Sequence, residues 1–401
     1  MTIRYFLGLL TLACTPSLAL DIQGHTGIEA RYFTEQSASQ ISAFGELELY
    51  WAADSNPSSV TFKAFGRVDD TDNERSHGDI RELSWLYYQD TWELKAGISK
   101  VFWGVTESAH RVDIINQTDA VESPDGEKKL GQPMIHFASI RDWGVLNAFI
   151  LPYFRERNFE GVDGYLGPDI TINSDTPLYQ SSREEKHTDI ALRYTHTLDI
   201  WDIGLSYFQG TDREPFLLPT MTGNEFSLTP FYAQIQQSGV DIQATISQWL
   251  WKLEATHKRY RDSDLAENSI AAPREDITAL TAGFEYTHVG IAGSAMDLGF
   301  LTEYHYNNHE GDQQTDPLQN DIFIGARLTF NDIQNTAILA GWIQDLDSSN
   351  SAMGFIEASR RLQDNWVITL DGRLFANKEP TDPLTFLNRA DHLTLQAAYY
   401  F

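Results

Sequence analysis

The chain has 401 residues and a formal net charge of −28, from 57 acidic and 29 basic side chains. This excess of negative charge repels nucleic-acid phosphates, so no nucleic-acid partner is expected. Aromatic residues make up 12% of the chain, yet the mean hydropathy is −0.35, a combination that does not fit a membrane bundle of apolar helices.

Residues 1–19 have the pattern of a secretory signal peptide. Arg4 supplies the positive charge, residues 5–13 are mostly apolar, and Ser17-Leu18-Ala19 has small residues at the cleavage positions. The segment is too short to span a bilayer as a helix. Cleavage after Ala19 would remove the only cysteine, Cys14, and leave a mature chain of residues 20–401 without disulfides. Lipid attachment at Cys14 is the alternative.

Apolar and polar residues alternate with a period of two in many segments of the mature chain. Such alternation predicts strands with one apolar and one polar face. No helical period lies between them, and no later stretch is long and apolar enough for a transmembrane helix. Clear examples are residues 28–32, 47–51, 60–68, 83–87, 92–98, 249–255, 298–304, 322–330 and 366–374. We count about 18 strands, with 16 as the alternative because two early segments are weakly marked.

The connections between these strands alternate in length. Short ones are expected near residues 90–91, 141–142, 198–199, 248, 289–290, 331–332 and 363–364, and long ones at 69–78, 101–133, 154–186, 211–229, 262–274, 308–319 and 376–389. Transmembrane barrels sort their connections in this way, with short turns at one end and long loops at the other. The sequence therefore predicts an all-β, antiparallel up-and-down transmembrane barrel. No linker divides residues 20–401 into two domains.

The last strand, residues 391–401, alternates without a break to the C-terminus. Its apolar row ends with Leu395, Ala397, Tyr399 and Phe401. This ending resembles the closing strand of Gram-negative outer-membrane β-barrels, in which the assembly machinery recognises a final Phe and an aromatic residue two positions earlier. The resemblance implies an outer-membrane location, with membrane lipid, lipopolysaccharide and the barrel-assembly machinery as partners. An ordinary terminal strand of a soluble sheet is the alternative.

If the apolar row faces lipid, the polar row must line the lumen, because an Arg or Lys facing hydrocarbon costs roughly 2–4 kcal/mol near the midplane. The two signs of charge are mixed in this row, which indicates a salt-bridged wall more than a dedicated solute track. The strongly basic lumen that alginate exporters would need is missing. The predicted lumen-lining residues are Arg67, Lys95, Lys252, Glu254, Glu303, Arg327, Asp371 and Arg373.

Residues 101–133 are the most unusual of the predicted connections, because apolar and polar residues alternate poorly there, and they resemble the constriction loop of porins. Trp103-Gly104, followed by Asp113, Asn116 and Asp119, is similar to a run found in some Gram-negative barrels. We expect an inserted constriction or plug loop whose apolar residues pack against the inner wall: Ile114, Ile115 and Val121. The residues predicted to face the water path, against Lys95 and Arg67, are Glu107, Arg111, Asp113 and Asp119. A loop lying outside the barrel is the alternative.

Enzyme signatures are weak. The 11 histidines are scattered without an HExxH motif, and neither GxSxG nor a P-loop is present. Glu303 and His305 are the best candidate acid–base pair, but two polar residues on one strand face arise easily by chance. We therefore expect no enzymatic activity, no cofactor and no dedicated metal site. Only weak binding of divalent cations is expected, at outer acids of residues 69–79 that would otherwise repel lipopolysaccharide phosphates.

These features predict a porin-like outer-membrane channel for passive diffusion of small hydrophilic solutes. Two other functional classes stay open. One is a barrel hydrolase, and the other is a plugged structural or surface barrel without channel activity.

Overall fold

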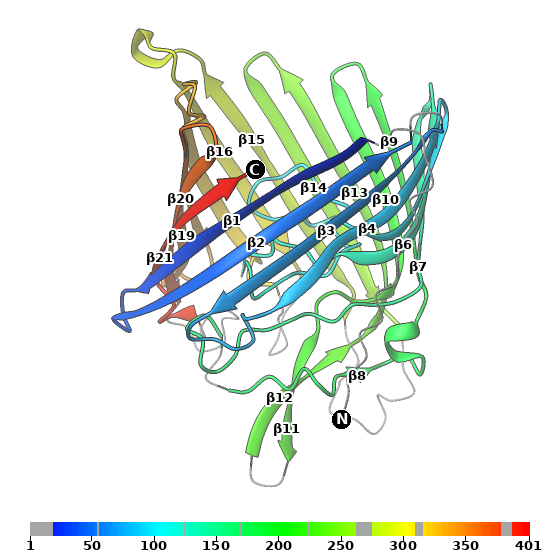
Figure 1. The fold of residues 1–401 in the computed structure, drawn as a ribbon, viewed down its shortest axis with the longest axis horizontal. Coiled ribbons are helices and arrows are strands. Elements are labelled where there is room, and N and C mark those ends of the chain that lie inside the picture. Colours follow the sequence, from blue (N-terminus) through cyan, green and yellow to red (C-terminus); the bar gives the residue numbers. More distant parts are fainter. Residues whose placement is uncertain are drawn as a thin grey trace, which may run out of the picture.

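The computed structural model describes residues 19–53, 56–123, 125–167, 170–222, 225–261, 275–308, 316–377 and 387–401. Within these ranges, 18 antiparallel strands form one sheet that closes on itself (Figure 1). β1 (Ala19–Phe33) pairs with both β2 (Ala38–Ala52) and the last strand, β21 (His392–Tyr400), so the sheet has no free edge. The prediction of an all-β barrel of about 18 strands is confirmed, and the alternative of 16 is wrong. The predicted signal peptide lies outside the described residues, apart from Ala19.

The remaining barrel strands follow in chain order, each paired with the next. They are β3 (Ser58–Asp69), β4 (Gly78–Gln89), β5 (Trp92–Ser99), β6 (Gln132–Arg141), β7 (Gly144–Leu151), β9 (Asp189–Leu198), β10 (Trp201–Thr211), β13 (Gln234–Ile246), β14 (Trp249–Tyr260), β15 (Ile277–His288), β16 (Asp297–Asn307), β17 (Asn320–Thr329), β18 (Ala337–Asp345), β19 (Ser351–Leu362) and β20 (Trp366–Asn377).

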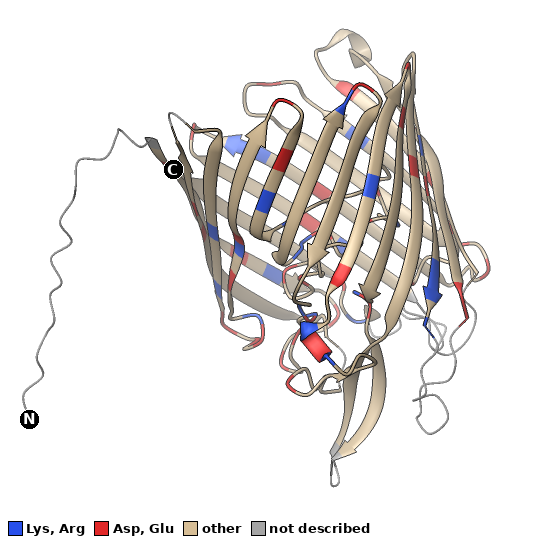
Figure 2. Cartoon of the chain, turned by 90° about the vertical axis from the view of Figure 1, so that its right-hand side faces the viewer, with Lys and Arg blue, Asp and Glu red and all other residues tan. Residues whose placement is uncertain are grey.

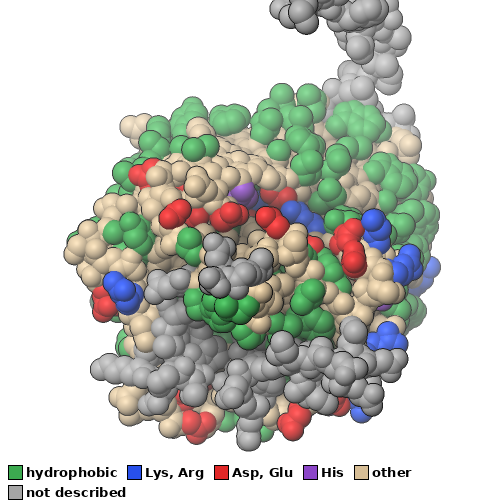
Figure 3. Space-filling model, turned by 90° about the horizontal axis from the view of Figure 1, so that it is seen from below, with side chains coloured by type: hydrophobic (Ala, Val, Ile, Leu, Met, Phe, Trp, Pro, Cys, Tyr) green, Lys and Arg blue, Asp and Glu red, His purple; other side chains and the backbone are tan. Residues whose placement is uncertain are grey.

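The period-two pattern separates an apolar outer face from a polar inner face. In β21, Leu393 and Leu395 are 45% and 52% exposed on the outside, whereas His392 and Thr394 are buried inside. Seen from the side of the long loops, hydrophobic side chains lie along much of the periphery and acidic ones nearer the centre (Figure 3). This distribution is what a wall between lipid and a polar interior requires. No helix among the described residues is long and apolar enough to cross a membrane.

Long and short connections lie at opposite ends of the barrel (Figures 1 and 2). Turns such as Asp90-Thr91 and Ser247-Gln248 close one end, and residues 100–131, 152–188 and 212–233 connect strands at the other. The long connections contain strands that the sequence did not predict. β8 (Leu178–Tyr179), β11 (Phe216–Thr222) and β12 (Glu225–Tyr232) form a separate three-stranded sheet beyond the barrel.

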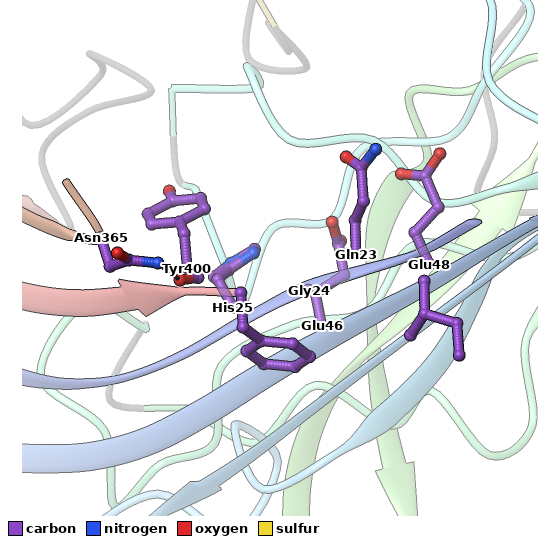
Figure 4. Close-up of a pocket in the computed structure, with 9 residues that line it drawn as sticks. Gln23, Gly24, His25, Glu46, Glu48, Asn365 and Tyr400 are labelled. Atoms are coloured by element: carbon purple, nitrogen blue, oxygen red, sulfur yellow. Dashed lines mark hydrogen bonds between the residues drawn. The ribbon is translucent and has the colours of Figure 1, made fainter.

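The barrel seam is closed by backbone hydrogen bonds that reach the last residue. Gly24 N–H donates to the Phe401 carbonyl at 3.1 Å, and Phe401 N–H donates back to the Gly24 carbonyl at 3.0 Å. Inside the seam, the Tyr400 ring stacks on His25 with centroids 5.0 Å apart, and Asn365 Nδ2 donates to the Tyr400 carbonyl at 2.6 Å (Figure 4). The last strand therefore pairs with the first strand along its whole length, up to the C-terminal residue.

Candidate functional site

The connection between β5 and β6 lies inside the barrel. It spans residues 100–131, so the predicted range was slightly too long, because Pro133 already belongs to β6. Ile114 and Ile115 are buried in a cluster with Phe149 of β7 and Phe208 of β10, and Val121 is buried as well. The apolar residues of this inserted segment therefore cover apolar side chains on the inner face of the wall, which would otherwise contact water.

A single amide side chain holds the two ends of the inserted segment together. Asn116 Oδ1 accepts a hydrogen bond from Val101 N–H at 2.8 Å. Its Nδ2 donates to the carbonyls of Ser99 and Leu130 at 2.9 and 2.8 Å. Because Asn116 is buried and bonded on all these sides, it fixes the exit of the segment from β5 and its return to β6.

Two glutamates of the wall anchor the inserted segment from the opposite side. Glu254 of β14 is fully buried and accepts hydrogen bonds from the N–H groups of Val105, Thr106 and Val112 at 2.6, 3.0 and 3.1 Å. The Thr106 hydroxyl adds a fourth at 2.7 Å. The backbone comes this close because residue 104 is glycine, with a φ of 142° that other residues rarely adopt.

Glu303 of β16 is the second anchor, two strands further along the sheet. Its carboxylate accepts hydrogen bonds from the N–H groups of Glu107 and Ser108 at 2.7 and 2.9 Å, and it also accepts the Ser108 hydroxyl. Glu254 and Glu303 are predicted lumen residues, and both do point inward. The inserted segment covers them, so their charge is compensated by its backbone donors.

Glu107 and Arg111, two predicted constriction residues, line the cavity beside the inserted segment, with side chains 22% and 8% exposed. Glu107 pairs with Arg327 of β17 at 2.6 Å and lies 3.9 Å from Lys252 of β14. Arg111 pairs with Asp316 and donates to the Leu318 carbonyl at 3.0 Å. The expected partners were wrong, because the segment crosses the lumen towards β14–β17.

Arg67 and Lys95, the partners expected for the constriction, are bound elsewhere. Arg67 is buried and pairs with Glu122 at 2.7 Å and with Glu29 at 3.3 Å. Lys95 pairs with Glu82 on the neighbouring strand at 3.4 Å, with its side chain 28% exposed. The partly exposed Lys95 stays a predicted lumen-lining residue, whereas Arg67 belongs to a closed salt-bridge cluster that includes Glu122 of the inserted segment.

Asp113 and Asp119, the other two predicted constriction residues, have buried side chains. Asp113 Oδ1 accepts from Trp103 N–H at 3.3 Å, and Lys129 lies 3.4 Å from Oδ2. Asp119 Oδ1 accepts from Asn158 Nδ2 at 2.6 Å. Burial raises the pKa of both carboxyl groups above the ordinary value, against the opposing effects of Lys129 and Asn158. The expectation that Asp119 faces the water path is wrong, because the fold of the segment encloses its side chain.

A cavity of about 800 Å³ lies between the inserted segment and the far wall of the barrel. Among the described residues that line it, seven are acidic and five are basic. The inserted segment contributes Glu107, Arg111, Asp113, Asp125, Glu127 and Lys129, and the wall contributes Lys252, Glu357 and Arg373. The cavity therefore has mixed charge with a small acidic excess.

Arg373 is the most strongly compensated cation at this cavity. Its guanidinium lies 2.7 Å from Glu357, 2.9 Å from Asp371 and 2.9 Å from Asp125 of the inserted segment. Arg373 lines the cavity, and Asp371 contacts it from the same strand. One cation surrounded by three carboxylates leaves an excess of negative charge at this point.

His110 is the one histidine of the inserted segment. Its Nε2 is 3.0 Å from Glu127 Oε1, and its ring contacts Phe102 edge-on with centroids 4.7 Å apart. Burial favours the neutral ring, but the hydrogen bond to Glu127 and the charges of Glu254 and Asp113 outweigh it and raise the pKa of His110. His110 lines the cavity, so its charge contributes to the field there.

This chain is similar to known proteins in its three-dimensional structure and not detectably in its sequence. No family model matches the sequence, and no curated protein matches it. Among solved structures, OpdK of Pseudomonas aeruginosa, determined with vanillate, superposes with a TM-score of 0.55 at 10% identity, covering 95% of this chain and 98% of OpdK. OccK5 (OpdH) and OpdL from the same organism give TM-scores of 0.53 and 0.51 at 12% and 11% identity, each covering 96% of this chain and 98% of the other. The chain has the fold of an outer-membrane β-barrel.

Within this outer-membrane barrel fold, the candidate acid–base pair is occupied by structural contacts. His305 Nε2 lies 3.0 Å from the Ser108 hydroxyl, and Nδ1 lies 3.0 Å from the Thr281 hydroxyl. Glu303 binds the inserted segment as described above. Over the described residues, no group of three or more His, Cys, Asp or Glu side chains could hold a metal ion.

The acids expected at the outer rim of the barrel have partners within the chain. Asp69 pairs with Arg75 at 2.8 Å, and Asp79 pairs with Arg155 at 2.9 Å. Asp72 accepts from the N–H groups of Glu74 and Gly161, both at 2.9 Å. These contacts order the loop between β3 and β4 and reduce the charge available to external cations.

Sequence reasoning missed the apolar side of the cavity lining. Leu339, Met353, Phe355 and Phe375 point into the lumen from β18, β19 and β20. For Phe375 a signal was present, because it lies in the same row as Asp371 and Arg373. For Leu339 the sequence is ambiguous, because residues 337–343 read AILAGWI and are apolar in both rows. Such a run does not say which apolar row faces lipid, so only the register of the barrel resolves it.

Proposed function

We propose that this protein is an outer-membrane channel for passive diffusion of small hydrophilic solutes. The observation that carries this proposal is the inserted segment 100–131, which is pinned to the inner wall by Glu254 and Glu303 and leaves a charged cavity beside it. An apolar outer face with a polar, partly filled interior suits a barrel in which a loop sets the pore width. Constriction residues would be Glu107 and Arg111, joined by Asp125 and Glu127.

The proposal includes the route to the membrane and the partners there. The signal-peptide pattern of residues 1–19 supports export, and the final aromatic pair Tyr399 and Phe401 supports recognition by the barrel-assembly machinery. The apolar outer face supports contact with membrane lipid and lipopolysaccharide. We propose no enzymatic activity and no cofactor.

The decisive experiment is conductance of the purified full chain in planar bilayers. Deleting residues 107–129 should raise single-channel conductance several-fold, because it removes the segment that narrows the lumen. The wall should stay folded, since its hydrogen bonds run between strands and do not pass through the segment. Persistence of heat-modifiable migration in gels checks the fold.

A matched control is a deletion of residues 219–228 in the β11–β12 hairpin, which projects away from the barrel (Figure 1). This deletion should leave conductance unchanged. If both deletions leave conductance and ion preference as they were, the inserted segment does not set the pore. If well-folded protein gives no conductance steps, the channel function is wrong.

A plugged barrel is the second candidate function. It is favoured by the extent to which the interior is filled, since the segment covers Glu254 and Glu303 and encloses Asp119. In that case the full chain would give no steps, and the 107–129 deletion would open a conductance that the full chain lacks.

A further inference from the structure

The wall opposite the inserted segment carries an apolar layer that faces the cavity. The strand register places Ile343 of β18 beside Met353 of β19, and Met353 beside Phe375 of β20. All three line the cavity. These strands lie at the left of Figure 1. Ile343 is buried in a cluster with Leu318 and Phe323, so the apolar side chains that border the cavity are mainly Met353, Phe355 and Phe375.

Two paired glycines allow aromatic rings to lie against this wall. Gly325 of β17 and Gly341 of β18 are register partners. A Cβ at Gly341 would lie 2.5 Å from ring atoms of both Phe323 and Phe355. The two rings are nearly parallel, with centroids 5.9 Å apart and an interplanar angle of 8°. Phe323 is fully buried, so of the two rings only that of Phe355 borders the cavity.

Carboxylates lie directly beside this apolar surface. Glu357 and Asp371 are register partners on β19 and β20, and Asp125 approaches from the inserted segment. Their side chains are 42%, 24% and 30% exposed, and all three contact Arg373. Arg373 in turn lies 5.2 Å from the centre of the Phe355 ring. The ionised cluster has a net charge of −2 and borders the aromatic surface.

We propose that this corner of the cavity binds small organic cations that have an apolar body, such as an aryl-alkyl ammonium. The apolar body would lie on Met353, Phe355 and Phe375, and the ammonium group would reach the carboxylates of Glu357 and Asp125. Pockets that combine apolar walls with a few convergent polar groups are the usual form of small-molecule sites. The proposal rests on the proposed channel function for its role as a solute-selective step, while the binding site itself can be tested without conductance.

The test is isothermal titration calorimetry of the detergent-solubilised full chain with phenethylammonium. Phenylacetate has the ring with the opposite charge, and methylammonium has the charge without the ring. Binding of phenethylammonium at one site per chain is expected, with much weaker binding of the other two. Glu357→Gln and Phe375→Ser should each weaken it about tenfold, since each removes one of the two kinds of contact.

The matched control is Glu48→Gln. Glu48 of β2 is a lumen-facing acid of similar exposure, 34%, paired with Lys63 at 2.6 Å and distant in the sheet from β19. The Glu48→Gln variant should bind phenethylammonium as tightly as the unchanged chain does. Heat-modifiable migration checks that each variant is folded.

Several outcomes would overturn the proposal. Equal binding of phenylacetate would contradict the sign of the site, and equal binding of methylammonium would contradict the role of the apolar wall. No binding by folded protein, or binding that Glu357→Gln and Phe375→Ser leave unchanged, would contradict the site itself. KCl conductance of the same preparation tests the channel function separately, because binding without conductance would indicate a plugged barrel that retains the site.

Discussion

Glu254 shows how a buried charge can be stabilised mainly by backbone donors. Its two carboxylate oxygens accept hydrogen bonds from Val105, Thr106 and Val112 in the inserted segment. A buried carboxylate without such donors would be strongly unfavourable. The same arrangement fixes the segment, because its buried N–H groups would lose their acceptor without the carboxylate.

Glu254→Gln should loosen the inserted segment without unfolding the barrel. The new amide would direct an N–H towards a backbone N–H, so one buried donor loses its acceptor, at a cost of about 1–3 kcal/mol. Single-channel recordings should show larger fluctuations of the open current, with heat-modifiable migration retained. Glu48→Gln, at an exposed lumen position, should behave like the unchanged chain. If the open current of Glu254→Gln fluctuates no more than that of the unchanged chain, the Glu254 carboxylate does not hold the inserted segment in place.

His110 should make ion preference depend on pH. Because its pKa is raised, the protonated ring persists above the ordinary value of about 6.5 and partly offsets the acids of the cavity. Any stability that this charge adds is present at low pH and lost as the pH rises through the raised pKa. Cation preference, measured from reversal potentials in a KCl gradient, should therefore increase as the pH rises above about 6.5. His110→Gln should remove this step, and an unchanged pH profile would contradict its assignment.

Among the elements of the fold, the inserted segment behaves as a small folded unit with its own interior. Asn116 holds the two ends of the segment together. Apolar side chains attach the segment to β7 and β10, and Glu254 and Glu303 attach it to β14 and β16. Its charged residues are divided by this fold into an enclosed group and a group that borders the cavity. In the proposed channel, the second group would act on an ion in the cavity.

The double variant Asp125→Asn with Glu127→Gln should shift ion preference towards anions. These side chains are 30% and 53% exposed at the cavity, so removing their charge changes the field that an ion meets. Asp119→Asn should leave the reversal potential nearly unchanged, because its side chain is enclosed. Measurement in a KCl gradient distinguishes the two. A shift from Asp119→Asn as large as from the double variant would show that the segment opens in the membrane.

For the molecule as a whole, the pairing of β1 with β21 removes the last open edge of an 18-stranded sheet. Every described strand of the barrel then has two neighbours, which satisfies its backbone groups where no water is available. The loop-end sheet of β8, β11 and β12 is not involved in this closure. Stability should therefore depend on the seam more than on the outer loops.

A disulfide across the seam would test the closure directly. Ile28 and Ala397 are register partners, and the only cysteine of the chain is Cys14. Ile28→Cys with Ala397→Cys should oxidise spontaneously and make the boiled protein migrate differently without reductant. Ile28→Cys with Leu393→Cys, which are out of register, should not cross-link. Failure of the in-register pair to form would contradict the closed barrel.

Local patterns in the sequence were enough to predict the barrel, its approximate strand number and the existence of an inserted segment. Period-two alternation and the sorting of loops by length are local properties, and a lipid-facing wall forces both to be visible in the chain. The same reasoning identified Ile114 and Ile115 as packing residues, since apolar side chains in a polar loop need a surface to cover.

Only the tertiary structure determined which charged residues pair and which of them reach water. Glu107 lies against Arg327 and Lys252 because the segment crosses the lumen, a path that no local pattern records. Asp119 is enclosed although its neighbours in sequence are partly exposed, and Leu339 faces the lumen from a stretch that is apolar in both rows. The cause is the same in each case. Ion pairs and cavities depend on distances between segments far apart in sequence, which register and closure fix together.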